Sequence, residues 1–306
     1  MRIRATVAAV TGALALSALV VPSAAQADDA HRSTVRDAAR AAQAASGAHS
    51  GAKSGARGIA AAGTAGVQLD LTFSKVTVNG GKPIAVGTTA TKTVATTYTV
   101  THAADVNIFS PDFVLDIGLY RGSFDTPTNE LFGAELPTCK AVSSTVATCK
   151  GRIDISPYDD LIGNADAATW KVTGFAVDLS NPDPSQIDFA VQDGLGTTKL
   201  QRFSKLTVNA SPEPVKKGRT ITITGKLSRA NWETHAYAGY SAQPVKLQFR
   251  KKTGSTYTTL KTIKSGSTGN LKTTATATVD GYWRYSFAGT ATTPAVTSAV
   301  DFVDVR

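Results

Sequence analysis

The amino-acid sequence predicts an all-β protein: two antiparallel β-sandwiches in tandem, preceded by an export signal and a largely disordered Ala/Gly-rich tail. Three observations carry this prediction. Apolar and polar residues alternate with period two over most of residues 67–306, which is typical of half-buried strands. Turn-forming residues separate the alternating stretches. A seven-residue segment recurs 130 positions downstream, which indicates two units of one type.

The N-terminus has the three parts of a secretory signal peptide. Arg2 and Arg4 are basic, residues 7–21 are mostly apolar, and Ala25-Gln26-Ala27 has the small residues of a cleavage site. The apolar run is too short to span a bilayer, and nothing comparable follows it. We therefore expect residues 1–27 to be removed and the mature protein to be secreted and extracellular, without a membrane span.

Residues 28–66 form a tail of mostly Ala, Gly and Ser, which cannot bury a core alone. Within it, Thr34 to Asp37 matches a capping box, residues 38–45 are nearly all Ala, and Gly47 is placed to end a helix. A helix this short is marginal in isolation. Two interpretations stay open: a flexible spacer, or a tail that orders on a partner. The contact residues for a partner would be Val35, Arg36 and Arg40.

The strands of the first unit are expected wherever the alternation is clearest. Gly, Pro, Asn and Asp punctuate them, for example at 79–81 and 181–184. Strands joined by such turns, with almost no helical periodicity, favour an antiparallel sandwich. The predicted strands cover residues 68–78, 93–101, 113–120, 168–179 and 186–191.

The two cysteines, Cys139 and Cys149, lie ten positions apart on flanks that alternate. An even number of cysteines in an exported chain favours a disulfide over metal or redox chemistry. If the two residues face each other, the midpoint is residue 144. The hairpin then has an odd loop, which we predict to be three residues long with a bulge.

The internal repeat divides the chain. Residues 73–79 and 203–209 share six of seven residues, and a Pro-containing turn and a Thr-rich strand follow both copies. Each copy resembles the first strand of a sandwich. We predict two β-domains, at residues 67–200 and 201–306, joined with almost no linker and thus held in a restricted mutual orientation.

The second unit resembles the Ig-like β-sandwich domains common in exported actinobacterial proteins. Residues 244–250, Tyr257, residues 280–289 and residues 301–305 carry this resemblance. It implies the fold but says little about function, because such domains occur in many unrelated proteins. Trp283, Tyr285 and Phe287 alternate on one face and are expected in the core. The first unit matches only the general sandwich type.

Charge divides the chain into two unlike halves. Residues 67–200 hold 9 basic and 15 acidic residues, whereas residues 201–306 hold 16 basic and 5 acidic ones. Such a basic half favours an anionic glycopolymer or an acidic protein partner. The alternatives are solubility and charged strand edges that discourage pairing. The candidate polyanion-binding residues are Lys216, Lys217, Arg219, Arg250, Lys251 and Lys252.

A loop between two predicted strands of the second unit contains Trp232, Tyr237 and Tyr240. These residue types are enriched among the anchors of protein interfaces. They would either contact a partner or a sugar face, or fold back to cap the open end of the sandwich.

Catalytic and metal-binding signals are weak. His31, His49, His102 and His235 lack the neighbours that a metal site or a Ser-His-Asp arrangement needs. The acidic stretch between Asp154 and Asp166 lacks the residue order of an EF-hand loop, which favours solvated loop acids over a calcium site. We expect no enzyme activity, catalytic residue, metal or cofactor.

The plan of leader, Ala-rich tail and two β-sandwiches is similar to that of the adaptor subunit of actinobacterial umbrella toxin particles. That family joins a lectin-like subunit to the repeats of a large toxin chain. The resemblance implies a secreted, non-catalytic adaptor whose partners are other secreted proteins. The alternative is an autonomous binder of cell-wall or extracellular polyanions. Nucleic acid is not expected among the partners.

Overall fold

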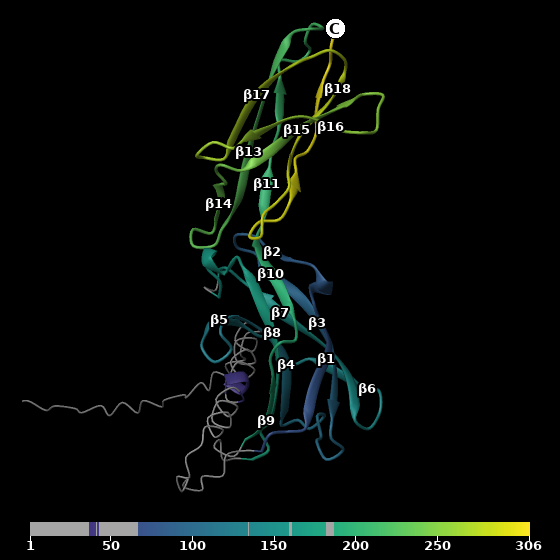
Figure 1. Ribbon diagram of the computed structural model, residues 1–306, viewed down its shortest axis with the longest axis vertical. Helices are drawn as coiled ribbons and strands as arrows, with labels where there is room; N and C mark the ends of the chain where they lie inside the picture. The colour runs from purple at the N-terminus through teal and green to yellow at the C-terminus, as the bar shows by residue number, and fades with distance from the viewer. Residues whose placement is uncertain (1–36, 41, 43–66, 134, 159–160, 182–186) are drawn as a thin grey trace, which may run out of the picture.

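The computed structural model shows two β-sandwiches stacked end to end in an elongated molecule (Figure 1). The structure describes residues 37–40, 42, 67–133, 135–158, 161–181 and 187–306. Nearly all regular structure is antiparallel strand, and each half has two sheets. The predicted fold class, two tandem Ig-like sandwiches, is therefore confirmed.

The first sandwich pairs the sheet β1-β3-β7-β6 with the sheet β2-β10-β8-β4-β5, in which β9 also pairs with β8. All pairs are antiparallel except the parallel pair of β2 and β10. Short 3-10 turns lie at Asn79–Gly81 and Asn164–Asp166. The strands are β1 Leu71–Val78, β2 Ile84–Val86, β3 Lys92–His102, β4 Phe113–Gly122, β5 Pro127–Leu131, β6 Thr138–Ala141, β7 Val146–Ile155, β8 Thr169–Asp178, β9 Asp188–Gln192 and β10 Thr197–Arg202.

The second sandwich pairs one sheet centred on β13 with another centred on β15 and β18. In the first, β13 pairs with β11, β12, β14 and β17; in the second, the order is β16-β15-β18, and both β19 and β20 pair with β18. The strands are β11 Ser204–Leu206, β12 Asn209–Ser211, β13 Thr220–Asn231, β14 Ala236–Gly239, β15 Pro244–Lys251, β16 Thr258–Lys264, β17 Asn270–Thr276, β18 Gly281–Phe287, β19 Val296–Thr297 and β20 Asp301–Val303.

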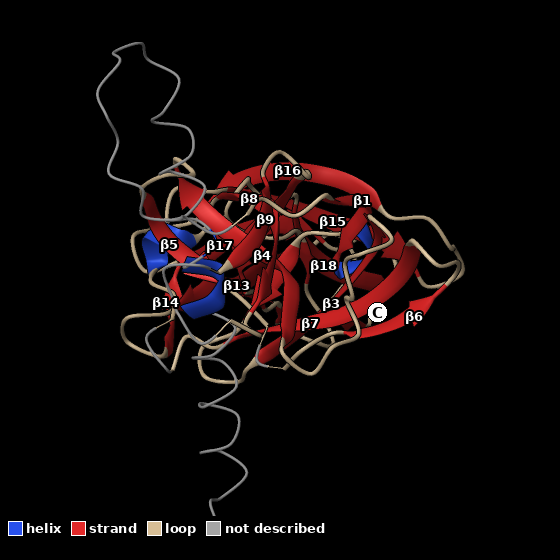
Figure 2. Cartoon of the chain, turned by 90° about the horizontal axis from the view of Figure 1, so that it is seen from below, coloured by secondary structure: helices blue, strands red, loops and turns tan. Residues whose placement is uncertain are grey.

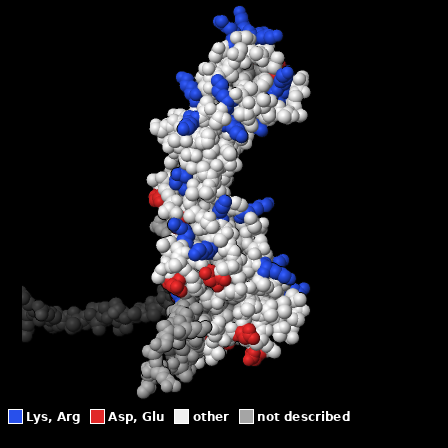
Figure 3. Space-filling model, viewed as in Figure 1, with Lys and Arg blue, Asp and Glu red and all other residues white. Residues whose placement is uncertain are grey.

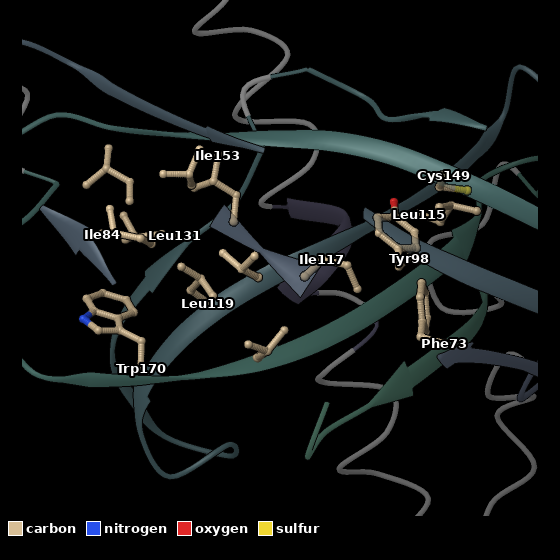
Figure 4. Packing of buried hydrophobic residues seen from close by; sticks show 14 of the residues in the cluster. Phe73, Ile84, Tyr98, Leu115, Ile117, Leu119, Leu131, Cys149, Ile153 and Trp170 are labelled. Atoms are coloured by element: carbon tan, nitrogen blue, oxygen red, sulfur yellow. The ribbon is translucent and has the colours of Figure 1, made fainter. Parts of the chain in front are cut away.

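Each sandwich has its own apolar core. In the first, Phe73, Ile117, Ile153 and Trp170 pack between the sheets (Figure 4). In the second, Trp283, Tyr285 and Phe287 are each at most 3% exposed, as their alternation predicts. Seen along the long axis, the molecule consists almost only of strands and loops (Figure 2).

Strand β4 differs from the predicted half-buried pattern, because all eight residues from Phe113 to Tyr120 are buried. One side of the strand faces the sandwich core. On the other side, Val114 packs with Phe175 of β8 and Phe189 of β9, and helical residues of the tail cover this second cluster through Ala39 and Ala42. The outer face of this sheet is therefore apolar and covered, which alternation in β4 alone does not reveal.

The two copies of the repeat occupy similar places but orient their first residue differently. Phe73 is 2% exposed in the first core, whereas Phe203 is 43% exposed. The pairing of β1 shifts register between Ser74 and Thr77, and Lys75 there has φ 51°. Such a bulge reverses which side chains face inward, so Phe73 and Phe203 face opposite ways, whereas Val76 and Leu206, after the shift, both pack on their cores.

The predicted disulfide joins Cys139 of β6 to Cys149 of β7, which are direct cross-strand partners. The N–H groups of Val142 and Ser143 both donate to the carbonyl of Val146. This leaves residues 143–145 as the loop, as the odd spacing predicts. The bond ties the edge strand β6 to the centre of its sheet.

Replacement of both cysteines by alanine should lower the free energy of unfolding by about 3 kcal/mol, since the bond closes a ten-residue loop. Urea denaturation followed by tryptophan fluorescence measures this loss. Dithiothreitol should destabilise the original protein by a similar amount and leave the double variant unchanged. Equal stability of both proteins without reductant would contradict the prediction.

No helix among the described residues is long and apolar enough to cross a membrane.

Candidate functional site

The two sandwiches meet at a junction that combines backbone hydrogen bonds, side-chain hydrogen bonds and a buried aromatic residue. Strand β10 passes into β11 through the single residue Phe203. Phe203 donates to the carbonyl of Val86 in the first sandwich and accepts from the N–H of Ala230 in the second. Arg202 donates its main-chain N–H to Thr292 and its side-chain Nε–H to the carbonyl of Ala230. The connection is thus continuous paired backbone rather than a linker.

Trp232 is the apolar centre of this junction. Its side chain is 1% exposed and belongs to the core cluster of the first sandwich, although β13 of the second sandwich positions it. Its indole Nε1–H donates to the carbonyl of Gly87 at 2.8 Å. A buried tryptophan with a satisfied N–H contributes large apolar area and fixed geometry. The second sandwich therefore inserts its own residue into the first core.

A reciprocal hydrogen-bonded clasp surrounds Trp232. Asn164 of the first sandwich accepts from the Trp232 N–H at 3.0 Å and donates to the side-chain oxygen of Asn231 at 2.8 Å. The N–H of Asn164 donates to Glu233 at 2.6 Å, and the His235 ring lies 3.1 Å from the carbonyl of Pro157. Polar contacts of this number, placed around a buried indole, fix the mutual orientation of the two halves.

The prediction that Trp232 is an exposed anchor for a partner is wrong, because its side chain is buried inside the protein. Tyr237 is partly buried against the first core, beneath the Lys205 ammonium at 3.8 Å. Tyr240 packs edge-on against Phe287 in the second sandwich. The alternative interpretation, in which this segment folds back to cap its own sandwich, describes only Tyr240, because Trp232 and Tyr237 pack against the core of the first sandwich. Burial raises the pKa of Tyr237.

Arg202 at the same junction is buried beside another cation. Burial and the neighbouring Arg229 lower the pKa of the Arg202 guanidinium to about 10. Its hydrogen bond to Ala230 satisfies part of this buried charge. Gln201 adds hydrogen bonds to the carbonyls of Thr290 and Ala291. The sequence does not predict that Arg202 and Gln201 join the two sandwiches, because their hydrogen-bond partners lie in a loop about 90 residues away.

The structure brings the two predicted basic groups together at the far end of the second sandwich. The turn that holds Lys216 and Lys217 lies beside the C-terminus, because a parallel β-bridge pairs Val215 with Val305. Val305 donates to Asp280, and Lys252 binds the same carboxylate at 3.3 Å. On the face shown in Figure 3, lysine and arginine side chains lie over both halves, whereas acidic side chains lie mostly over the first sandwich.

Only part of the predicted tail contact can be placed. Val35 and Arg36 lie outside the described residues. Arg40 is 51% exposed at its side chain and lies 3.8 Å from Glu130 of β5. The helical residues beside it pack on the protein's own sheet. This ordered fragment therefore has an intramolecular contact.

The acidic stretch does not form one cluster. Asp154 pairs with Thr93 and Arg152, while Asp166 binds Arg121 at 2.6 Å. Asp159 and Asp160 lie outside the described residues. In the described part of the chain, no group of three or more His, Cys, Asp or Glu residues is arranged to hold a metal ion.

One buried titratable group stands apart from these surfaces. Asp116 is 0% exposed within the first sandwich, and burial raises its pKa from 3.8 to about 7, although N–H groups of Ile117 and Gly133 favour the charged form. The Tyr98 hydroxyl lies close enough to this carboxyl to favour its charged form, yet the Tyr98 and Thr96 hydroxyls and the Asp116 Oδ2 atom make no hydrogen bond of ordinary geometry among the described residues. Because the carboxyl is fully buried, its ionisation affects the stability of the first sandwich.

Comparisons with known proteins give no family. No protein-family model and no curated protein matches the chain. Among solved structures, it is similar to the Ig1–Ig3 ectodomain of mouse nectin-like molecule 4 (13% identity, TM-score 0.23, covering 76% of this chain and 65% of that one). It is also similar to the adhesin InvE of Yersinia pseudotuberculosis, with 11% identity and a TM-score of 0.23 over 76% of this chain and 58% of that one. The D00-D0 domain of intimin has 13% identity and a TM-score of 0.24 over 76% of this chain and 99% of that one. The chain thus spans less than two thirds of the first two.

Similarity at these TM-scores carries no argument about function. The assignment of the fold depends on the sheets and cores described above.

Proposed function

We propose that this protein is a secreted, non-catalytic adaptor that holds partners at a fixed separation within an extracellular assembly. The observation that carries the proposal is the junction, in which Trp232 of one sandwich is buried in the core of the other. Two binding domains that move independently do not need a residue of one inserted into the core of the other. An adaptor that sets the geometry of an assembly benefits from this insertion, because it restricts the orientation of the domains and so reduces the entropy lost on binding.

The unlike charge of the two halves supports the proposal further. The first sandwich has a net negative charge and the second a strongly positive one. Complementary charge steers partners and excludes wrong ones. Different partners would thus be directed to different ends of the rod.

The tail supplies the third contact in this proposal. Its helical residues are anchored on the first sandwich through Ala38, Ala39 and Ala42. A partner that binds this anchored segment is held beside the first sandwich, at high effective concentration for a second contact. Within this plan, the finer proposal is an adaptor of the umbrella toxin type, placed between a lectin-like subunit and a large toxin chain.

The test is mass spectrometry of proteins that co-elute with the tagged mature chain from its own culture supernatant. Partners should be lost from a variant lacking residues 28–66 and from R36E/R40E, which reverses two tail charges. The charge-matched control K53E/R57E, elsewhere in the tail, should keep them. Recovery of the unaltered chain as a lone monomer would overturn the adaptor role. If the control also loses its partners, the net charge of the tail determines binding, and Arg36 and Arg40 are not specific contacts.

A further inference from the structure

The outer face of the sheet β16-β15-β18-β20 carries an arrangement that the adaptor role does not use. Arg250 of β15 lies opposite Tyr282 of β18, and Tyr282 lies opposite Phe302 of β20. Arg284 of β18 lies two positions along the same face, opposite Gln248. The alternate residues of these strands form the core, so this row faces outward. All of its members are partly exposed.

These planar side chains stack on one another. The Arg284 guanidinium lies 3.6 Å from the centre of the Tyr257 ring, and Arg250 lies 5.3 Å from the same ring and 4.2 Å from Tyr282. The rings of Tyr282 and Phe302 are 5.1 Å apart. We call Arg250, Arg284, Tyr257, Tyr282 and Phe302 the arginine–tyrosine array. Stacking on an aromatic face holds a guanidinium in place and leaves its N–H edge available.

Among the described residues, neither guanidinium of the array has a carboxylate within 4.0 Å. Arg284 donates Nε–H to Gln248 at 2.8 Å, and Arg250 donates to the carbonyl of Gly254 at 2.7 Å. Each guanidinium has five N–H donors, so several remain for a ligand. Both guanidiniums are held against the Tyr257 ring, and neither is paired with a carboxylate. Guanidinium groups placed in this way favour oxyanions, which they bind through two parallel hydrogen bonds.

The surroundings indicate the form of the ligand. A hollow of about 260 Å³ at this end of β15 is lined by Phe249 and Lys251, which face the other side of the sheet, so it is not part of the array. Lys251 and Lys252 follow Arg250 in the sequence and add positive charge at this end of β15. The face is a flat sheet surface, not an enclosed pocket. It suits an extended chain with repeated negative charges and with rings that can lie against Tyr282 and Phe302.

We propose that the arginine–tyrosine array is a binding site for a linear acidic glycan, a sugar polymer that carries carboxylate or phosphate groups. The guanidinium edges bind the oxyanions, and the partly exposed aromatic rings contact the apolar faces of the sugars. The site lies wholly within the second sandwich, so its existence does not depend on the adaptor role.

The test measures binding of the purified mature chain to polygalacturonate, which carries carboxylates, and to glycerol-phosphate teichoic acid. The variant R250K/R284K keeps the net charge but loses the planar forks. The matched control K226Q/K272Q removes two exposed charges from the opposite sheet. We expect the first variant to weaken binding at least about tenfold, and the control to weaken it less than about threefold. Unchanged melting temperatures establish that both are folded.

Three results would overturn the proposal: no binding to either acidic glycan, equal weakening by the control variant, or tighter binding to poly-glutamate than to both glycans. The last would identify an acidic protein as the ligand. Preference for one of the two glycans would support the proposal and identify the oxyanion. Co-elution of secreted partners is a separate readout, so failure here leaves the adaptor role to its own test.

Discussion

Replacement of Trp232 by alanine should uncouple the two sandwiches and lower the free energy of unfolding by about 3–5 kcal/mol. The variant loses a side chain that is 1% exposed and leaves the carbonyl of Gly87 without its donor. The junction should then open while both sandwiches stay folded. Arg202, which is 8% exposed there, becomes a site for trypsin. We expect cleavage after Arg202 to be at least about tenfold faster under native conditions.

Trp283→Ala is the matched control for this prediction. Trp283 is also nearly completely buried, but within the second core, against Phe249 at 4.7 Å between ring centres. Its loss should lower the unfolding temperature of the second sandwich without exposing Arg202. If W232A and W283A are cut at Arg202 at the same rate, Trp232 contributes only to general stability, and the rigid junction on which the adaptor proposal rests is wrong.

The stability of the protein should fall as pH rises from about 4 to about 7, because of Asp116. Its pKa is about 7 in the folded protein and 3.8 when unperturbed. Below pH 3.8 the carboxyl is protonated in both states and costs nothing. Above pH 7 it is ionised in both, and the folded state bears the cost of a buried charge, roughly 4 kcal/mol. Urea denaturation at pH 5 and pH 8 measures the part of this cost that arises between the two pH values, roughly 2–3 kcal/mol, because the unfolded carboxyl is already ionised at pH 5.

Asp116→Asn should remove this pH dependence and stabilise the protein at pH 8 by about 2 kcal/mol or more. The amide oxygen can still accept the N–H of Ile117, and the amide group can donate to the unpaired hydroxyls of Thr96 and Tyr98. Asp105→Asn, at an exposed position, should leave the pH profile unchanged. A D116N protein that keeps the same loss of stability between pH 5 and pH 8 would show that other groups cause it.

Local features of the fold follow from the sequence. The alternation over 93–101 corresponds to β3, since alternating side chains place one face of a strand inward. The stretch 168–179 corresponds to β8, but the residues from Val172 to Val177 are all buried there, because the outer face of this sheet is also covered. The spacing of Cys139 and Cys149 predicts their cross-strand bond and its three-residue loop. The alternation in 281–287 places Trp283, Tyr285 and Phe287 in the core, and the intervening Tyr282 and Arg284 on the outer face. These features depend on residues close together in the chain.

Only the tertiary structure decides where distant segments meet. The sequence identifies Trp232 as an aromatic residue in a loop, but its burial depends on Gly87 and Asn164, more than 60 positions away. The arginine–tyrosine array requires the register of β15, β18 and β20, because pairing alone brings Arg250, Tyr282 and Phe302 into one row. Phe73 and Phe203 share a sequence context yet differ in burial, because a register shift in β1 changes which face is inward. Periodicity determines the strands, whereas long-range pairing and packing determine what each exposed or buried side chain contacts.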